Sequence, residues 1–421
     1  MTDDGGSFTH LLAEPAVEGP PVRLGIAGLG LAGALMVRAA ALESGVKLVA
    51  AADPREAPRA AFARDFGARA YADIGELCRD PQVEAVYVGT PHQFHAEHAR
   101  LAARHGKHVV LEKPMGLTLA DCDVILDAVR EHGVQLLVGH THAYDPAIRA
   151  MRRIIASGRI GRLRMLATLN YTDFLYRPRR PEELDTSRGG GIVFNQLPHQ
   201  IDILRTLGGG LLRSVRASCA VLDAARPTEA CATAFLEFAD GVAATLAYSG
   251  ADFFDSDELH GWVGEGGDPK QPRHGSARRA LVARGSTSEA ELRAGRLAYG
   301  ALPLRPEAPQ FPPHFGTTIA TCEAGELKCS PEGLTLYDAA GAHVLALPRG
   351  SGYQGLFTDL RSALRAGVAP RHDGRWGKAG TEAMLGLLRS ARERREIQLA
   401  CQVPLAPRDF STRESIQGDK P

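Results

Sequence analysis

The residues best suited to carry chemistry are a lysine and a histidine from distant parts of the chain. Lys113 follows the apolar run His108–Leu111, within the sequence Glu112-Lys113-Pro114. A lysine at the carboxyl end of a strand lies where open α/β sheets bind their ligands, and the proline after it restricts the backbone. We expect Lys113 to take the proton of a secondary alcohol, with His199 completing an acid–base pair. The alternatives are a solvated lysine at a turn and a helix histidine satisfied by the backbone.

A glycine-rich loop near the N-terminus supplies a second element of this chemistry. The apolar run 22–27 leads directly into the loop 28–33, which opens a helical stretch to about Glu43. The pattern G-x-G-x-x-G between a strand and a helix predicts a dinucleotide site, whereas the glycines alone would fit a structural turn. A second apolar run, 46–52, ends at Asp53, twenty positions after Gly33. An acid there accepts hydrogen bonds from an adenosine ribose and favours NAD, although the nearby Arg55 leaves NADP open.

Further strand ends add candidates for the same crevice, because the carboxyl ends of parallel strands meet at one edge of a sheet. The predicted cofactor-binding residues are Gly28, Leu29, Gly30, Leu31, Ala32, Gly33, Asp53, Arg55, Thr90, Pro91, His95, Glu112, Lys113 and His140. Histidines 92, 95 and 98 recur every three residues, so a metal site is an alternative reading of this segment. They lack a cysteine or carboxylate at ligand spacing, and we therefore predict no metal.

The elements that must position these residues change in kind along the chain. Apolar runs at 22–27, 46–52, 68–71, 85–88, 107–111 and 135–139 alternate with helical stretches. This alternation predicts an α/β fold with an N-terminal Rossmann domain, a doubly wound parallel sheet. Runs at 163–171, 214–222, 230–238 and 242–248 follow one another without a helix after each, which predicts a C-terminal α+β domain with a mostly antiparallel sheet. We expect a loose arm at 1–21, domains at 22–145 and 146–403, a partly mobile excursion at 251–310, and a loose tail at 404–421.

The second domain contains the candidates for substrate binding. Four arginines within a dozen residues, in a stretch stiffened by two prolines, suit recognition of carboxylates, because a guanidinium can bind each carboxylate through two hydrogen bonds. Such a run is alternatively a solvated loop or a subunit contact. A single helix running to about Leu207 would place two further candidates, Asn195 and His199, on one face. The predicted substrate-binding residues are His142, Tyr144, Arg177, Arg179, Arg180, Arg188, Asn195 and His199.

Composition excludes several classes of partner. The 421 residues are 44% apolar and 23% charged, and 49 basic residues balance 49 acidic ones. No global field favours nucleic acid or membrane, and no apolar run is long enough to span a bilayer. The seven cysteines form no Cys-x-x-Cys pair and no signal peptide is evident, so we expect reduced thiols and a cytoplasmic protein. An exposed sheet face in the second domain would favour a homo-oligomer.

These motifs together resemble the Gfo/Idh/MocA oxidoreductase family. The resemblance covers most of the chain and is carried by residues 28–33, Thr90-Pro91, Glu112-Lys113-Pro114, Tyr144-Asp145-Pro146 and the segment from Gly189-Gly190-Gly191 through His199 to Asp202. It implies that Lys113 and His199 act at the substrate carbinol. It also places Asn195 where the family commonly has an aspartate, so this residue is able to orient a hydroxyl but not to take its proton.

Within the family, two stretches, Tyr171–Gly191 and Pro312–Thr317, are similar to phthalate 4,5-cis-dihydrodiol dehydrogenases. This similarity implies NAD-dependent oxidation of a carboxylated cis-dihydrodiol to a catechol, with an aromatic-derived dicarboxylate as the small-molecule substrate. The alternatives are a sugar or inositol (polyol) dehydrogenase of the same family and a non-catalytic NAD-binding regulator.

Overall fold

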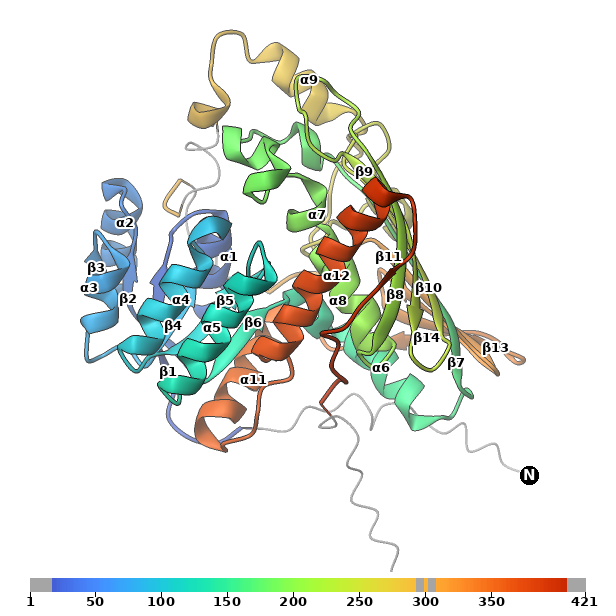
Figure 1. Cartoon of the computed structure of the whole chain (residues 1–421), viewed down its shortest axis with the longest axis horizontal. Coiled ribbons are helices and arrows are strands. Elements are labelled where there is room, and N and C mark those ends of the chain that lie inside the picture. The colour runs from blue at the N-terminus through green and yellow to red at the C-terminus, as the bar shows by residue number, and fades with distance from the viewer. Residues whose placement is uncertain (1–16, 293–298, 302–307, 407–421) are drawn as a thin grey trace, which may run out of the picture.

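The computed structural model describes residues 17–292, 299–301 and 308–406, which form two sheets with helices between and around them (Figure 1). Most of the predicted arm and of the predicted tail therefore lies outside the described residues. In the part of the chain that is described, no helix is long and apolar enough to cross a membrane.

The first sheet is parallel, as the sequence predicts, and has the strand order β3-β2-β1-β4-β5-β6. Its strands are β1 (Val22–Ala27), β2 (Val46–Ala52), β3 (Arg69–Tyr71), β4 (Ala85–Val88), β5 (His108–Glu112) and β6 (Leu136–Gly139). The helices that alternate with them are α1 (Leu31–Ala40), α2 (Glu56–Phe66), α3 (Ile74–Arg79), α4 (His95–Arg104) and α5 (Leu119–Glu131). The strand order reverses between β1 and β4, and this reversal opens the crevice in which such sheets bind ligands.

The second sheet has nine strands in the order β14-β13-β12-β11-β7-β10-β9-β8-β15. The strands are β7 (Leu163–Tyr171), β8 (Leu212–Ala220), β9 (Cys231–Phe238), β10 (Ala243–Ser249), β11 (Thr317–Cys322), β12 (Gly325–Ser330), β13 (Gly333–Asp338), β14 (Gly341–Ala346) and β15 (Ile397–Gln398). Every neighbouring pair is antiparallel except β7 and β10, which confirms the predicted mostly antiparallel sheet.

Helices cover the face of this sheet that is turned toward the first sheet (Figure 1). They include α6 (Pro146–Ser157), α7 (Gly191–Asn195), α8 (Leu197–Leu207) and α12 (Gly374–Glu393). The opposite face is open: Met165 is 46% exposed and Phe235 is 49% exposed. The helix α6 did not figure in the sequence-based expectation.

One late helix returns to the first sheet. The helix α11 (Gly352–Arg365) contributes Leu356 and Leu360 to the same apolar cluster as Leu24 and Ile26 of β1. The helix α12 then runs along the boundary and packs against α5, β6 and β8. The chain thus enters the second half after β6, returns to the first with α11, and leaves it again along α12 to β15. A division at residue 145 therefore separates the strands of the two sheets but not all of the helices that pack on them.

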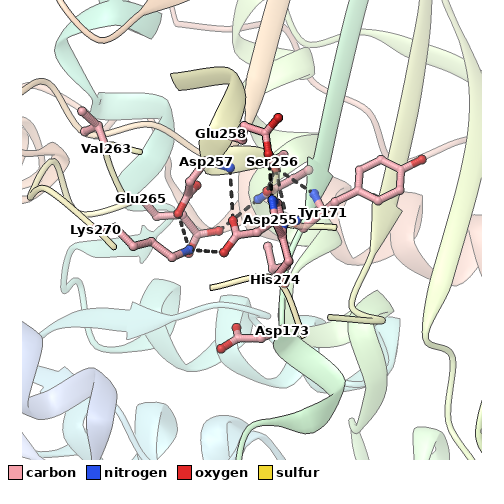
Figure 2. Close-up of polar contacts among 12 residues, drawn as sticks. Tyr171, Asp173, Asp255, Ser256, Asp257, Glu258, Val263, Glu265, Lys270 and His274 are labelled. Carbon is pink, nitrogen blue, oxygen red and sulfur yellow. Dashed lines mark hydrogen bonds and ion pairs between the residues drawn. The ribbon is translucent and has the colours of Figure 1, made fainter. Parts of the chain in front are cut away.

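The excursion after β10, residues 251–310, contacts β7 through its first residues. It contains the short 3-10 helix η7 (Ser256–His260) and the helix α9 (Ser276–Ala283). Lys270 makes ion pairs of 2.5 Å with both Asp255 and Asp257 (Figure 2). The Ser256 hydroxyl donates to the Asn170 side chain at 3.0 Å, near the end of β7. These contacts hold this part of the excursion against the end of β7 in the second sheet. The sequence did not predict this placement.

Candidate active site

A large cleft of about 1670 Å³ runs from the glycine-rich loop to the second half of the molecule. Gly28, Asp53, Thr90 and Lys113 contribute to its walls from the ends of β1, β2, β4 and β5. The predicted convergence of strand ends on one crevice therefore holds for these four residues, but not for His140, which does not line the cleft. The other wall comes from the loop around Arg177 and from α9.

The three glycines of the loop have separate reasons for lacking a side chain. Gly28 has φ +93°, a left-handed conformation that glycine adopts without strain. A Cβ at Gly33 would lie 1.9 Å from the Gly28 carbonyl oxygen, so only glycine lets α1 pack this closely. A Cβ at Gly30 would meet nothing within 4 Å and would project into open space at the start of α1. This open approach to a helix N-terminus fits the pyrophosphate of a dinucleotide.

The Asp53 side chain is hydrogen-bonded to the glycine-rich loop. Its carboxylate accepts hydrogen bonds from the Leu29 amide at 2.8 Å and from the Arg55 amide at 2.9 Å, and it pairs with the Arg55 guanidinium at 2.8 Å. Burial opposes ionisation of Asp53, but these hydrogen bonds outweigh burial and keep its pKa below the usual value. Asp53 is thus an anion at the position predicted to receive the adenosine ribose, and Arg55 places a half-exposed cation beside it.

Lys113 lies at the junction of the two halves. It follows β5, and its Nζ donates a 2.8 Å hydrogen bond to the backbone carbonyl oxygen of Asn195. Burial lowers the pKa of Lys113, the positive charge of Arg179 lowers it further, and the negative charge of Glu112 opposes both effects. A lysine with a lowered pKa that lines a cleft is able to lose its proton and to act as a base.

The Glu112 carboxylate is held next to Lys113 by two hydrogen bonds. The Tyr87 hydroxyl donates to one oxygen of Glu112 at 2.7 Å, and the Lys113 backbone amide donates to the other at 3.2 Å. Burial raises the pKa of Glu112, against the effect of the lysine charge. We therefore place Glu112 beside the lysine as well as on the cofactor wall.

His199 lies near Lys113 but is not among the residues that line the cleft. Burial lowers its pKa well below the usual value, and the charge of Lys113 contributes to the shift. Its ring is 4.8 Å from that of His142 and 4.7 Å from that of Phe315. His142 is held by Asp145 at 2.7 Å, and although burial acts to lower its pKa, the Asp145 carboxylate raises it overall. The pKa values of the two histidines are therefore shifted in opposite directions, and His199 is neutral.

The single helix predicted to carry Asn195 and His199 is wrong. The chain forms α7 and α8 instead, separated at Gln196, whose φ of −116° departs from helical values. The Asn195 side-chain amide donates to the Gly189 and Gly191 carbonyls, at 3.0 and 2.8 Å. Asn195 reaches the site through its backbone carbonyl, which holds Lys113.

The four arginines line the cleft but are not equivalent. Arg177 gives its Nε to Asp173 at 2.7 Å. Arg179 is almost buried, with its guanidinium 3.7 Å above the Phe174 ring and bonded to the Phe174 carbonyl. Arg180 pairs with Glu182 at 3.3 Å and with Glu183 at 3.4 Å, whereas Arg188 has no ion-pair partner among the described residues. The structure thus makes Arg179 part of the framework of the loop, whereas Arg177 is partly exposed and Arg188 is exposed.

Some predicted residues are not on the cleft. The Tyr144 hydroxyl donates to Asp359 at 2.7 Å, inside the core, so the structure does not bring it to the substrate. His140 is buried against the His372 ring at 5.9 Å, where burial lowers its pKa to about 3. Leu29 and Gly33 act through the loop rather than on its surface.

His95 lines the cleft but also serves the framework. Its Nδ1 is 2.8 Å from the Pro114 carbonyl and its Nε2 is 3.0 Å from the Thr90 carbonyl. Burial lowers its pKa to about 4, so the ring is neutral and only one of these contacts is a hydrogen bond. Among the described residues, no group of three or more histidine, cysteine or acidic side chains could hold a metal ion.

Several residues of the site were missed from the sequence. Gln196 lines the cleft beside Asn195, Phe315 packs on the His199 ring, and Asp173 fixes Arg177. The available signal was position, because Gln196 lies in the glycine-to-histidine segment and Phe315 in the stretch 312–317. Arg273, Ala280 and Arg284, from the excursion, also line the cleft and had no signal of their own.

The fold and the cleft together define a dinucleotide-dependent oxidoreductase. Its first half carries the dinucleotide-binding loop, and its second half forms the opposite wall of the cleft. Comparison with known proteins makes the class specific. A family model described as "Oxidoreductase family, NAD-binding Rossmann fold" matches residues 22–140, and one described as "GFO/IDH/MocA C-terminal domain" matches residues 148–261. The chain belongs to the Gfo/Idh/MocA oxidoreductase family, and its predicted cofactor, NAD, is confirmed at the level of the family.

Individual relatives agree with this placement. The chain is 39% identical over 383 residues to the 1-carboxy-3-chloro-3,4-dihydroxycyclohexa-1,5-diene dehydrogenase of Comamonas testosteroni, covering 87% of this chain and 94% of that protein. It is 30% identical to the scyllo-inositol 2-dehydrogenase (NAD(+)) of Bacillus subtilis over 48% of this chain and 59% of that protein. The crystal structure of a protein from Bordetella bronchiseptica RB50, described as a dehydrogenase, is similar to this structure with a TM-score of 0.86. The two chains are 43% identical, and the match covers 90% of this chain and all of the other.

Proposed function

We propose that this protein oxidises a carboxylated cis-dihydrodiol, of the phthalate 4,5-cis-dihydrodiol type, to the corresponding catechol with NAD. The observation that carries the proposal is the Lys113 amine, with its lowered pKa, in one cleft with the glycine-rich loop and an arginine-bearing wall. The C. testosteroni relative, by its name, acts on a dihydrodiol that carries a carboxylate. The role in degradation of phthalate or a related aromatic acid follows from the same proposal.

The proton of the reacting hydroxyl goes to Lys113. In its neutral form the amine accepts this proton while the carbinol carbon loses hydride, so the C–OH becomes C=O. Bound NAD supplies the hydride acceptor, held by the backbone of the loop 28–33 and by Asp53. The resulting hydroxydienone tautomerises to a catechol, and aromatisation makes the overall reaction favourable. The Asn195 carbonyl orients the amine through its hydrogen bond, and His199 is neutral beside the charge of Lys113.

A direct assay tests the proposal. The purified protein, supplied with NAD, is offered phthalate 4,5-cis-dihydrodiol, a monocarboxylated cis-dihydrodiol, an uncarboxylated cis-dihydrodiol, myo-inositol and glucose. We expect NADH and catechol in equal amounts from the carboxylated dihydrodiols, with a much larger kcat/KM than for the polyols. Oxidation of inositol or glucose in preference would replace the proposal by its nearest alternative, which the Bacillus relative represents. NAD binding without turnover of any substrate would identify the regulator.

Assembly and location are proposed on other grounds. The open face of the nine-stranded sheet carries apolar side chains, including Met165 and Phe235, and we infer that it is covered in a homo-oligomer. Light scattering at assay concentration tests this, and a monomer would contradict it. All seven cysteines are free thiols, which supports the proposed cytoplasmic location.

A further inference from the structure

Gln196 occupies the break between α7 and α8, next to the residue that holds the reacting amine. Its side chain lines the cleft and is only 9% exposed. The adjacent Asn195 carbonyl accepts the Lys113 hydrogen bond at 2.8 Å, so Gln196 is fixed close to the reaction centre. No motif points to it, because a glutamine between two helices is usually a polar residue at a turn.

A directed chain of hydrogen bonds sets the orientation of the Gln196 amide. The Phe174 amide donates to the Thr172 hydroxyl oxygen at 3.1 Å, and the Thr172 and Tyr248 hydroxyls are 2.7 Å apart. The Tyr248 hydroxyl donates to Oε1 of Gln196 at 3.1 Å. In this arrangement the Thr172 proton goes to Tyr248 and the Tyr248 proton goes to Gln196. The reversed amide would leave the Thr172 proton without an acceptor among these groups, so the observed orientation is the satisfied one.

This orientation leaves the amide nitrogen of Gln196 as a donor. With Oε1 taken by Tyr248, Nε2 has no hydrogen-bond partner among the residues that the structure describes. Gln196 lines the open cleft, so a ligand bound there can accept a hydrogen bond from this nitrogen. Its two N–H groups can only donate, so the matching ligand atom is an acceptor, and a neighbouring cation would favour an anionic acceptor over a neutral one.

Arg177 adds a second donor beside the same tyrosine. Asp173 accepts a hydrogen bond from the Arg177 Nε, which leaves the two terminal nitrogens, and the Arg177 side chain is 36% exposed. Arg177 and Tyr248 are close enough for each to affect the other's ionisation, and Asp173 and Glu265 are the acidic groups that face them. Glu265 is occupied by a 3.0 Å hydrogen bond from Asn170, in the cluster shown in Figure 2. Two sets of donors therefore face the cleft near Lys113, one neutral and one cationic.

We propose that Gln196 and Arg177 form the subsite for the substrate's carboxylate, with Tyr248 and Thr172 acting as positioning residues for the Gln196 amide. A carboxylate only accepts hydrogen bonds, and it complements an amide N–H together with a guanidinium. The subsite gives the enzyme its preference for a carboxylated ring over a neutral polyol. This inference rests on the proposed function, because it assumes that the enzyme acts on a carboxylated dihydrodiol.

The test is the substitution Gln196→Glu, which keeps the shape and the acceptor for Tyr248 but replaces the donor by an anion. We expect KM for the carboxylated dihydrodiol to rise roughly 100-fold, while KM for the uncarboxylated one changes less than about threefold. Tyr248→Phe frees the amide to rotate and should raise the first KM roughly fivefold with little change in kcat. The surface substitution Gln398→Glu, on β15, is the matched control and should change neither constant.

The outcomes separate the two claims. If the wild-type enzyme oxidises carboxylated dihydrodiols but Gln196→Glu affects both substrates equally, the subsite is wrong and the proposed function stands. If the wild-type enzyme oxidises none of them, both are wrong. Should Gln196→Glu fail to fold, Gln196→Met removes the donor without adding charge. A selective rise of roughly tenfold in KM would then support the subsite, and an unchanged KM would overturn it.

Discussion

The two walls of the cleft are built in different ways. The cofactor wall is made of strand ends and backbone: Gly28 turns the chain, Gly33 lets a helix approach, and Asp53 binds the Leu29 amide. The substrate wall is made of side chains that hold one another, such as Arg177 with Asp173 and Tyr248 with Gln196. Changes on the first wall should therefore act through backbone shape, and changes on the second through individual charges and donors.

The largest effect should come from the residue that joins the two walls. Lys113→Met removes the base and its hydrogen bond to Asn195, so kcat for the dihydrodiol should fall roughly 10³-fold. NAD binding should stay within a few fold, because the glycine-rich loop is untouched. Steady-state kinetics and a fluorescence titration with NADH measure the two quantities. Retained turnover would remove Lys113 from the mechanism.

A pair of glycine substitutions tests the cofactor wall. In Gly33→Ala the new methyl would lie 1.9 Å from a backbone carbonyl that cannot give way. The free energy of unfolding should fall by roughly 1–3 kcal/mol, and NAD affinity should fall with it. Gly30→Ala has open space around the methyl, so stability should hold while NAD binds roughly tenfold more weakly. Chemical denaturation and NAD titration separate them, and equal stability losses would contradict the assignment.

A pair of arginine substitutions tests the substrate wall. Arg177→Met should raise KM for a carboxylated dihydrodiol at least roughly tenfold. Arg179→Met should instead lower the free energy of unfolding by roughly 1–2 kcal/mol, because it removes the stacking on Phe174, while KM changes little. Kinetics and denaturation of both variants give the comparison. If only Arg179→Met raised KM, Arg179 would be the arginine that binds the carboxylate, and Arg177 would not.

The last prediction needs no substitution at Lys113 and concerns the pH dependence of kcat/KM. Only neutral Lys113 acts as a base, so kcat/KM should rise about tenfold per pH unit below its pKa and level off above it. Because burial lowers this pKa, the plateau should begin below the pH expected of a solvated lysine. The variant His199→Asn should show the same rise of kcat/KM with pH. If that rise disappeared in the variant, the titrating group would be His199 rather than Lys113.

Sequence reasoning succeeded where local pattern decides structure. The bounds of β1, β2, β4 and β7 match the predicted apolar runs, because burial on a sheet imposes a pattern that the sequence carries locally. The crevice followed from strand ends alone, since parallel strands place their carboxyl ends at one edge.

It failed where a distant partner decides. Tyr144 turns to Asp359, more than 200 residues away in the chain, and no local pattern announces that contact. The helix breaks at Gln196, and the Asn195 amide bonds to the Gly189 and Gly191 carbonyls, although a continuous helix would have placed Asn195 and His199 on one face. Of four similar arginines, Arg179 became part of the framework because Phe174 lies beneath it. Tertiary contacts decided each of these cases.

The central claim is that one amine serves both walls. A crystal structure with NADH and a carboxylated cis-diol analogue tests it most directly. The account predicts the Lys113 Nζ within hydrogen-bonding distance, about 3 Å, of a diol oxygen whose carbon faces the nicotinamide ring. An analogue bound elsewhere, or a Lys113 amine turned to bulk solvent in that complex, would contradict it.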